Sequence, residues 1–227
     1  MFHRMEVAMF VRGGFMSTFV LILLTGCGEI SDPSTGEFYT DDAKSNQIEV
    51  DHFALVDGTP DAVGVLAFVN DEATSLHMLD VEAKLDSRAA RGIIHHRNGP
   101  DGTYGTWDDE PFKTIEALDA VKWVGGRAIG RLVDYSNQYG WVPSATEHLG
   151  NYDGVAFTVL EADITLALVN DSSLEQLDDL LNRRAAIGLF ENGPFASIYE
   201  VALVRYVGRS AMTTLKNSAT EAVRIQK

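Results

Sequence analysis

Leu66-Ala67-Phe68-Val69-Asn70-Asp71 is repeated almost unchanged as Leu166-Ala167-Leu168-Val169-Asn170-Asp171, at an offset of 100 residues. The two hexapeptides differ only at their third position, where phenylalanine is replaced by leucine. A near-identical match at such a distance indicates an internal repeat. The sequence therefore predicts a fold that contains two related units.

Further short matches keep the same order along the chain while the offset between the two copies decreases. Such a decrease is expected when one copy carries an insertion that the other lacks. We therefore expect a first unit over residues 56–140, a linker over 141–154 and a second unit over 155–221. The matching pairs are Arg88-Ala89-Ala90 with Arg184-Ala185-Ala186 at an offset of 96, and Pro111-Phe112, Val124-Gly125 and Leu132 with Pro194-Phe195, Val207-Gly208 and Leu215 at an offset of 83.

The local signals within both units are those of short helices. Thr59 followed by Pro60 is an N-cap with a first-turn proline. Capping-box patterns begin at Thr158 and Ser197. Residues 87–97 carry apolar side chains at the spacing of one helical face. Few segments alternate with a period of two, so the sequence predicts an all-α fold.

The N-terminal residues have the pattern of an export signal. Two arginines precede an uncharged apolar run at residues 15–24, which is too short to span a bilayer as a helix. The run leads into Leu24-Thr25-Gly26-Cys27, which resembles the lipobox of bacterial lipoproteins and holds the single cysteine of the chain. The resemblance implies that residues 1–26 are a cleaved lipoprotein signal peptide and that Cys27 is acylated, with palmitate for example. A retained membrane anchor with an incidental cysteine is the alternative.

The rest of the chain is acidic and starts with a polar stretch. Residues 27–55 are mostly small, polar and acidic, as in a flexible tether after the lipidated cysteine. The formal charge of the whole chain is −15, which repels nucleic acid on average, although a local basic patch can override it. Gly28 stands where an aspartate often marks inner-membrane retention in lipoproteins of double-membraned bacteria. This resemblance implies a place in the bacterial cell envelope, at the outer membrane.

The order of residues in each unit resembles the tandem helix-hairpin-helix domain of bacterial competence DNA-uptake receptors and related secretion-system proteins. The resemblance implies two helix-hairpin-helix units and sequence-independent binding of double-stranded DNA. The matching positions in the first unit are Asn70, Ser75, Leu76, Leu79, Ala90, Ile93, Ile94, Pro111, Phe112, Thr114, Val121, Gly125 and Leu132. Those in the second unit are Asn170, Ser173, Leu174, Leu177, Ala186, Leu189, Phe190, Gly193, Pro194, Phe195, Ser197, Val204, Gly208 and Leu215.

The chain departs from this family at its hairpins. In the family each hairpin reads glycine, an aliphatic residue and glycine, which leaves backbone N–H groups uncovered to hold a phosphate. Residues 84–86 and 180–182, here named the early hairpins, contain no glycine. Residues 123–125 and 206–208, the late hairpins, keep one glycine each. In the first early hairpin, Asp86 stands where a phosphate would approach, and we expect it to cap the following helix.

The resemblance makes Gly125 and Gly208, with the neighbouring Arg127 and Arg209, the candidate phosphate-binding residues. The alternative is that the two glycines only permit turns that helix packing requires. A stripe of basic residues favours DNA binding. The other interpretation of this stripe is a solvated helix face whose positive charges are balanced by nearby acidic side chains. The stripe consists of Arg88, Arg91, His95, Lys122, Arg127 and Arg131.

Residues 99–110 are an insertion in the first unit and are rich in aspartate and glycine. They resemble the calcium loops of secreted bacterial proteins, because Asp101, Asp108 and Asp109 offer the oxygen ligands that a hard cation prefers. The register does not fit an EF-hand, and an acidic surface loop without an ion is the alternative. Calcium is the only candidate cofactor.

Nothing in the sequence indicates catalysis. Ser, His and Asp occur without a nucleophile motif, and the adjacent His95 and His96 cannot face the same way on a helix. Our leading hypothesis is a membrane-anchored extracytoplasmic binding or adaptor lipoprotein that contacts an unidentified protein, and the sequence implies no small-molecule substrate. A surface receptor for double-stranded DNA is the alternative.

Overall fold

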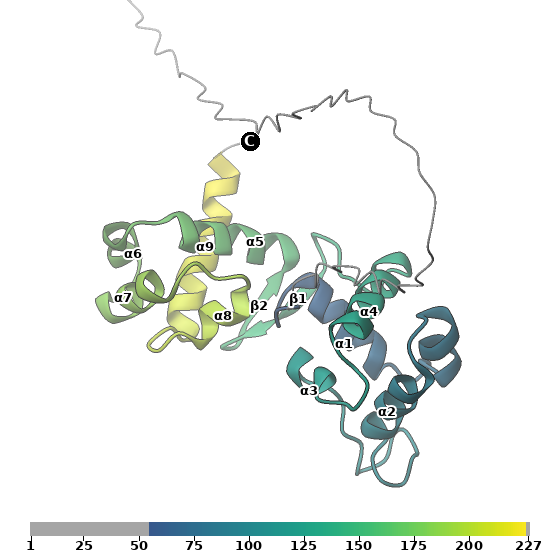
Figure 1. Cartoon of the computed structure of the whole chain (residues 1–227). Coiled ribbons are helices and arrows are strands. Elements are labelled where there is room, and N and C mark those ends of the chain that lie inside the picture. Colours follow the sequence, from purple (N-terminus) through teal and green to yellow (C-terminus); the bar gives the residue numbers. More distant parts are fainter. Residues whose placement is uncertain (1–54, 226–227) are drawn as a thin grey trace, which may run out of the picture. The chain divides into compact units, whose positions relative to one another are not determined.

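A computed structural model of the protein describes residues 55–225, so the predicted signal peptide and Cys27 lie outside the described residues. The described chain is mainly helical (Figure 1). In chain order its elements are α1 (Pro60–Asn70), the π-helical turn η1 (Met78–Glu82), α2 (Ser87–Arg97), α3 (Ile115–Asp119), α4 (Gly126–Gln138), β1 (His148–Tyr152), β2 (Val155–Thr158), α5 (Val159–Asp171), α6 (Leu174–Leu180), α7 (Arg183–Asn192), α8 (Ile198–Leu203) and α9 (Arg209–Ile225).

Two separate hydrophobic cores hold these elements together. The first is built by α1 to α4, with the fully buried Phe68 against the rings of Tyr135 and Trp141 at 4.6 and 5.5 Å between ring centres. The second is built by α5 to α9 together with the strands, around the buried Phe157 and Leu215. Burial of such side chains is the main stabilising term for each group of helices.

Each core contains the same asparagine clamp. The side-chain amide of Asn70 donates to the carbonyl of Phe112 and its oxygen accepts from the Phe112 N–H, both at 2.8 Å. Asn170 makes the same pair of bonds with Phe195, both at 2.9 Å. Each clamp fixes the turn that carries a buried phenylalanine to the end of the helix that opens its unit, α1 or α5.

A close helix contact also occurs at corresponding places. A Cβ added to Gly92 would lie 2.8 Å from a methyl group of Val121, and one added to Gly188 would lie 2.9 Å from a methyl group of Val204. Real side chains do not approach so closely. Glycine is therefore needed on α2 and α7, where each helix meets the segment before the late hairpin.

The helix starts predicted from local sequence are confirmed. Thr59 caps α1, α2 covers Ser87–Arg97, and Thr158 forms both bonds of a capping box with Glu161. Ser197 caps α8, but there Glu200 accepts from the N–H of Ala196, so only half of the predicted box forms. These signals succeed because a cap contacts only the first turn of its own helix.

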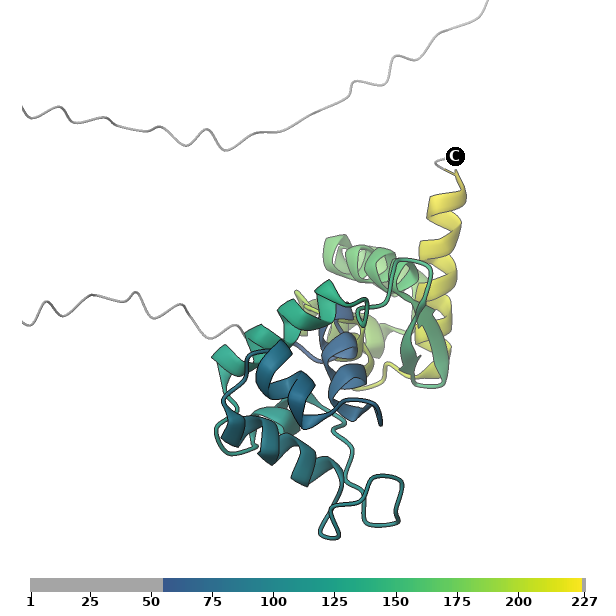
Figure 2. The same ribbon diagram turned by 90° about the vertical axis from the view of Figure 1, so that its right-hand side faces the viewer.

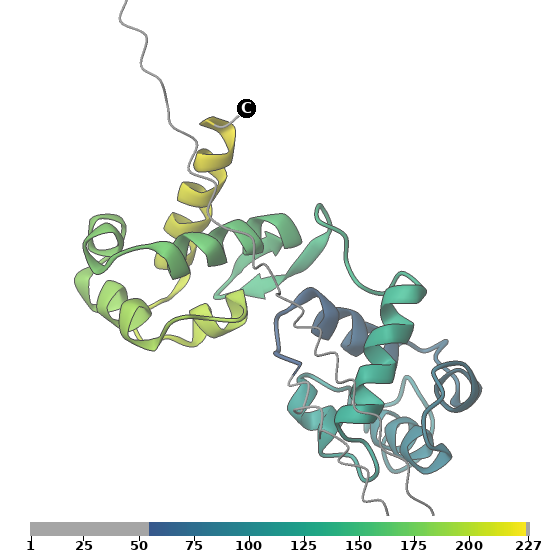
Figure 3. The same cartoon turned by 45° about the horizontal axis from the view of Figure 1, so that its top comes forward.

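The prediction of an all-α fold is wrong in one place. Strand β1 lies within residues 141–154, the expected linker, and pairs with β2 in an antiparallel hairpin beside α5 (Figure 3). Asp153 and Gly154 form its two-residue turn with φ of +50° and +76°. Asp-Gly is a strong signal for such a turn because both positions need positive φ. The short strands around it hid the alternation that marks longer ones.

Candidate functional site

The four hairpins share one local design. Each precedes a helix: residues 84–86 precede α2, 123–125 precede α4, 180–182 precede α7 and 206–208 precede α9. Their middle residues are apolar and turn toward the cores. Leu85, Val124 and Val207 are buried, whereas Leu181 is half-buried. The third residue of every hairpin stands at the N-terminal end of the following helix.

Aromatic side chains occupy the first position of the late hairpins. Trp123 has a φ of +75° and Tyr206 a φ of +72°, a backbone region that favours glycine. The side chain of each is about half exposed, at 51% and 49%. Both turns therefore hold a non-glycine residue in a conformation that glycine adopts more easily. The sequence analysis noted the missing glycines but not the aromatic residues that replace them.

The early hairpins are closed by their own side chains. An oxygen of Asp86 accepts from the N–H of Arg88 at 2.9 Å, and Asn182 accepts from the N–H of Ala185 at 3.1 Å. Hydrogen bonding from the Arg88 side chain lowers the pKa of Asp86 to about 2, so this carboxylate is ionised at neutral pH. The prediction that Asp86 caps a helix is confirmed. Neither early hairpin offers a free helix start to an external anion.

The late hairpins remain open. Gly125 and Gly208 precede α4 and α9, and a Cβ built on either would meet nothing within 4 Å. Gly125 has an extended φ of −167°, which any residue adopts. Neither a positive φ nor close packing requires glycine at these two positions. The alternative that the two glycines only permit turns required by helix packing is therefore not supported. No side chain caps α4, and Gly125 and Gly208 are both half-buried.

The cations near the late hairpins lie over aromatic rings. In the first unit the guanidinium carbon of Arg88 lies 4.0 Å from the centre of the Trp123 ring, and the Lys122 ammonium lies 5.2 Å from it. In the second unit Arg184 and Arg205 lie over Tyr206 at 5.5 and 4.8 Å. These are corresponding positions in the two units. Cation and ring attract each other at such distances.

Arg127 and Arg209, predicted together, do not occupy corresponding positions. Both are exposed, but the offset of 83 residues aligns Arg127 with Ser210. The side chain of Arg209 extends toward Gly154 in the turn of the β-hairpin, where its Nε would lie 3.9 Å from an added Cβ. The predicted pair is therefore not one duplicated feature.

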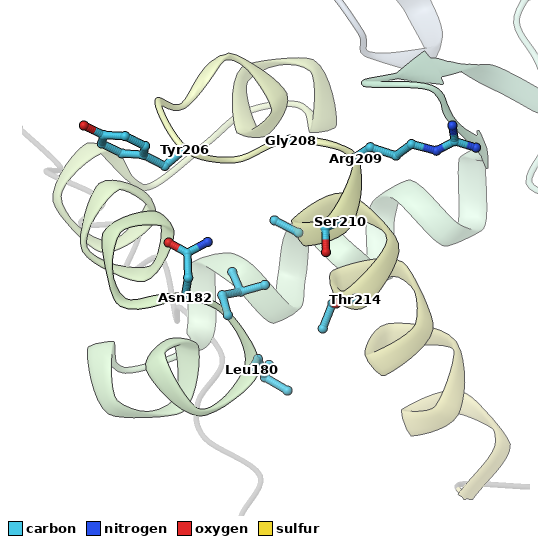
Figure 4. Close-up of a pocket in the computed structure, with 9 residues that line it drawn as sticks. Leu180, Asn182, Tyr206, Gly208, Arg209, Ser210 and Thr214 are labelled. Carbon is cyan, nitrogen blue, oxygen red and sulfur yellow. The ribbon is translucent and has the colours of Figure 1, made fainter.

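A pocket of about 440 Å³ lies between the two hairpins of the second unit (Figure 4). Leu180, Asn182, Ser210 and Thr214 face it, whereas the side chain of Arg209 extends away from it. The offset of 83 residues aligns Thr214 with Arg131 of the first unit. The guanidinium of Arg131 donates to the carbonyl of Lys84 in the early hairpin. Arg131 of α4 thus contacts the early hairpin of the first unit, whereas Thr214 at the aligned position of α9 lines the pocket.

The insertion is a long loop between α2 and α3 (Figure 2). Its three aspartates serve the loop itself: Asp101 accepts from the N–H of Thr103, Asp108 from the N–H of Asp101, and Asp109 from the N–H of Gly105. Within residues 55–225 no three His, Cys, Asp or Glu side chains are grouped to hold a metal ion. The structure thus gives each of the three aspartates a hydrogen bond within the loop, and calcium binding by Asp101, Asp108 and Asp109 stays a prediction.

Arg97, which the sequence analysis missed, anchors the segment that precedes this loop. Its side chain is 3% exposed, and Nη1 donates to the carbonyls of Val69, Asp71 and Thr74 at 3.3, 2.6 and 3.1 Å. The Tyr104 ring of the insertion lies 4.9 Å from the guanidinium carbon. Burial lowers the pKa of Arg97, but a guanidinium stays charged at neutral pH.

No protein family, curated protein or solved structure was found to match this chain. Within the described residues no helix is both long and apolar enough to cross a membrane.

Proposed function

We propose that this protein is a lipid-anchored adaptor of the bacterial cell envelope that contacts another protein through two tandem helix-hairpin-helix units. The tandem assignment is supported by the matching asparagine clamps at Asn70 and Asn170 and by the glycine contacts at Gly92 and Gly188. It is also supported by the common design of the four hairpins. Contacts that recur in the same order are expected of two copies of one structural unit.

The observation that carries the proposal is the pair of half-exposed aromatic rings at the late hairpins. Trp123 and Tyr206 stand where a glycine would expose the backbone, and aromatic residues are enriched at protein interfaces. The early hairpins, closed by Asp86 and Asn182, offer no place for a phosphate. A chain of charge −15 also disfavours a long polyanion as its partner.

Double-stranded DNA is the second candidate partner, and one observation favours it. Gly125 and Gly208 precede α4 and α9 although neither a positive φ nor close packing requires glycine there, and no side chain caps α4. Uncovered helix starts attract phosphate, and the arginines near each late hairpin add positive charge. The two candidates differ in a measurable way, because binding to phosphates falls steeply with salt.

For the chain without residues 1–27, we expect no appreciable binding to duplex DNA at physiological salt. With one helix start preceded by glycine in each unit the phosphate contacts are few, and the overall field is negative. A gel-shift titration over a range of salt concentrations measures this. Tight binding under those conditions would overturn the adaptor proposal in favour of the DNA receptor.

If duplex binding is seen, replacing Arg127 and Arg209 with Glu should remove it and leave the helicity measured by circular dichroism unchanged. Both side chains are exposed and lie outside the two cores. Lys113→Glu combined with Arg224→Glu is the control, since it changes the net charge equally at exposed positions outside the hairpins. Equal loss in both double variants would mean that only the overall charge matters.

The anchor is proposed from the lipobox-like residues and is tested separately. Cys27→Ser should give an unprocessed precursor without lipid, because the chain has no second cysteine that could be acylated. Labelling with radioactive palmitate, gel mobility and membrane fractionation beside the wild type measure these effects. A mature form with unchanged mobility and membrane association would refute the assignment.

A further inference from the structure

The insertion carries the most exposed large apolar side chain of the described residues. Trp107 is 96% exposed, whereas Leu203, the next in order, is 66% exposed. The loop that holds Trp107 projects from the helices of the first unit (Figure 2). Tryptophan is on average a highly buried residue, because its ring is the largest apolar surface of any side chain. Its position on a projecting loop therefore indicates a contact with another surface.

Hydrogen bonds order the loop around this side chain. The hydroxyl of Tyr104 donates to the carbonyl of Asn70 at 3.1 Å. The hydroxyl of Thr106, the residue before Trp107, lies 2.7 Å from a carboxylate oxygen of Asp108. A loop that is already ordered loses little conformational freedom when it binds. These contacts hold the loop in place and leave the indole in water.

The tip of the loop is uncharged. Residues 102–107 are Gly, Thr, Tyr, Gly, Thr and Trp. The acidic side chains on either side, Asp101 and Asp108, accept hydrogen bonds from N–H groups of the loop itself. Tryptophan and tyrosine are enriched at the boundary between lipid and water, because the ring is apolar and its N–H or O–H still reaches water. The tip therefore suits the headgroup layer of a bilayer.

A bilayer is the one surface that the proposed anchor always keeps near the loop. Residues 28–54 reach at most about 95 Å even when fully extended, so a chain acylated at Cys27 cannot move far from the membrane. Linking two contacts in this way raises the effective concentration of the second, so that even a weak one forms. The formal charge of −15 disfavours an anionic surface, whereas a zwitterionic one does not repel it.

We propose that Trp107 inserts into the headgroup layer of a zwitterionic bilayer and is a second point of attachment besides Cys27. The inference rests on the proposed lipid anchor and adds a contact that the anchor alone does not supply. A second point of attachment limits how freely the folded chain tumbles at the surface. This restriction lowers the entropic cost of a later contact with a partner protein.

The test uses the mature chain from Cys27 onward, which contains every residue of both cores. Its single cysteine is coupled to a maleimide lipid in phosphatidylcholine vesicles, so the anchor does not depend on acylation in cells. Lipids brominated near the headgroups quench tryptophans that meet the bilayer. We expect them to remove about one third of the emission, since Trp107 is one of three tryptophans. Equal emission in brominated and plain vesicles would overturn the proposal.

Two variants identify the tryptophan that meets the bilayer. Trp107→Ala should abolish the quenching by brominated lipid. Trp123→Ala is the matched control, because it removes a half-exposed tryptophan outside the insertion and should leave the quenched emission unchanged. Quenching that survives Trp107→Ala, or that is lost in Trp123→Ala, would overturn the assignment to Trp107.

A second measurement does not depend on tryptophan emission. A single myristoyl chain coupled to Cys27 gives only marginal, reversible binding, so vesicle sedimentation detects any further contact. Trp107→Ala should lower the partition into phosphatidylcholine vesicles by about tenfold, and Trp123→Ala should leave it unchanged. Equal partition of the wild type and Trp107→Ala would overturn the second attachment. The proposed adaptor function is judged by different results, the acylation of Cys27 in cells and the capture of a membrane protein, so it would stand after such a failure.

Discussion

Replacing Arg97 with Ala is expected to lower the free energy of unfolding by about 3 to 5 kcal/mol. The side chain is 3% exposed and donates to three carbonyls near the end of α1. Without it those carbonyls lose their charged donor inside the protein, and Tyr104 loses the cation beneath its ring. Urea unfolding followed by circular dichroism measures the change.

Two variants make this prediction specific. Arg91→Ala removes an exposed arginine from the same helix and should change the free energy of unfolding by no more than about 0.5 kcal/mol. Arg97→Lys keeps the charge but loses the planar fork of donors, so it should recover only part of the stability. If Arg97→Ala were no more destabilising than Arg91→Ala, the anchoring role of Arg97 would be refuted.

The second large effect is expected at the two clamped phenylalanines. Phe112→Ala and Phe195→Ala should each lower the free energy of unfolding by about 3 to 5 kcal/mol, because each leaves a cavity in its own core. The two side chains are 3% and 8% exposed. The effects should be similar if the two units are copies of one structure. Denaturant unfolding of both variants measures them.

Phe190→Ala is the control for this pair. Its side chain is 54% exposed, so the loss should be a small fraction of that for the buried phenylalanines. Unfolding curves that are unaffected by either Phe112→Ala or Phe195→Ala would remove the assignment of tandem units. A large effect in one unit and none in the other would do the same.

Much of the candidate site could be predicted from the sequence. The residues of the four hairpins were predicted from the resemblance to helix-hairpin-helix domains, and the cap at Asp86 followed from the residue type before a helix. The anchoring role of Arg97 could not be predicted from the sequence, because its hydrogen-bond acceptors lie 23 to 28 residues away along the chain. The hydrogen bonds of the three aspartates of the insertion could not be predicted for a related reason, since the direction of each side chain depends on the path of the loop.

The sequence by itself determined where several of the helices start, and it predicted which residues of the two units correspond. A cap such as Thr158 acts within one turn, and Phe112 and Phe195, predicted as equivalent core residues, are both buried because large apolar side chains fill the cores. Only the tertiary structure decided that an arginine of α4 contacts the early hairpin of the first unit, while a pocket lies at the aligned place in the second. Arg131 and Lys84 are 47 residues apart, and no local pattern records that the helix of one reaches the hairpin of the other.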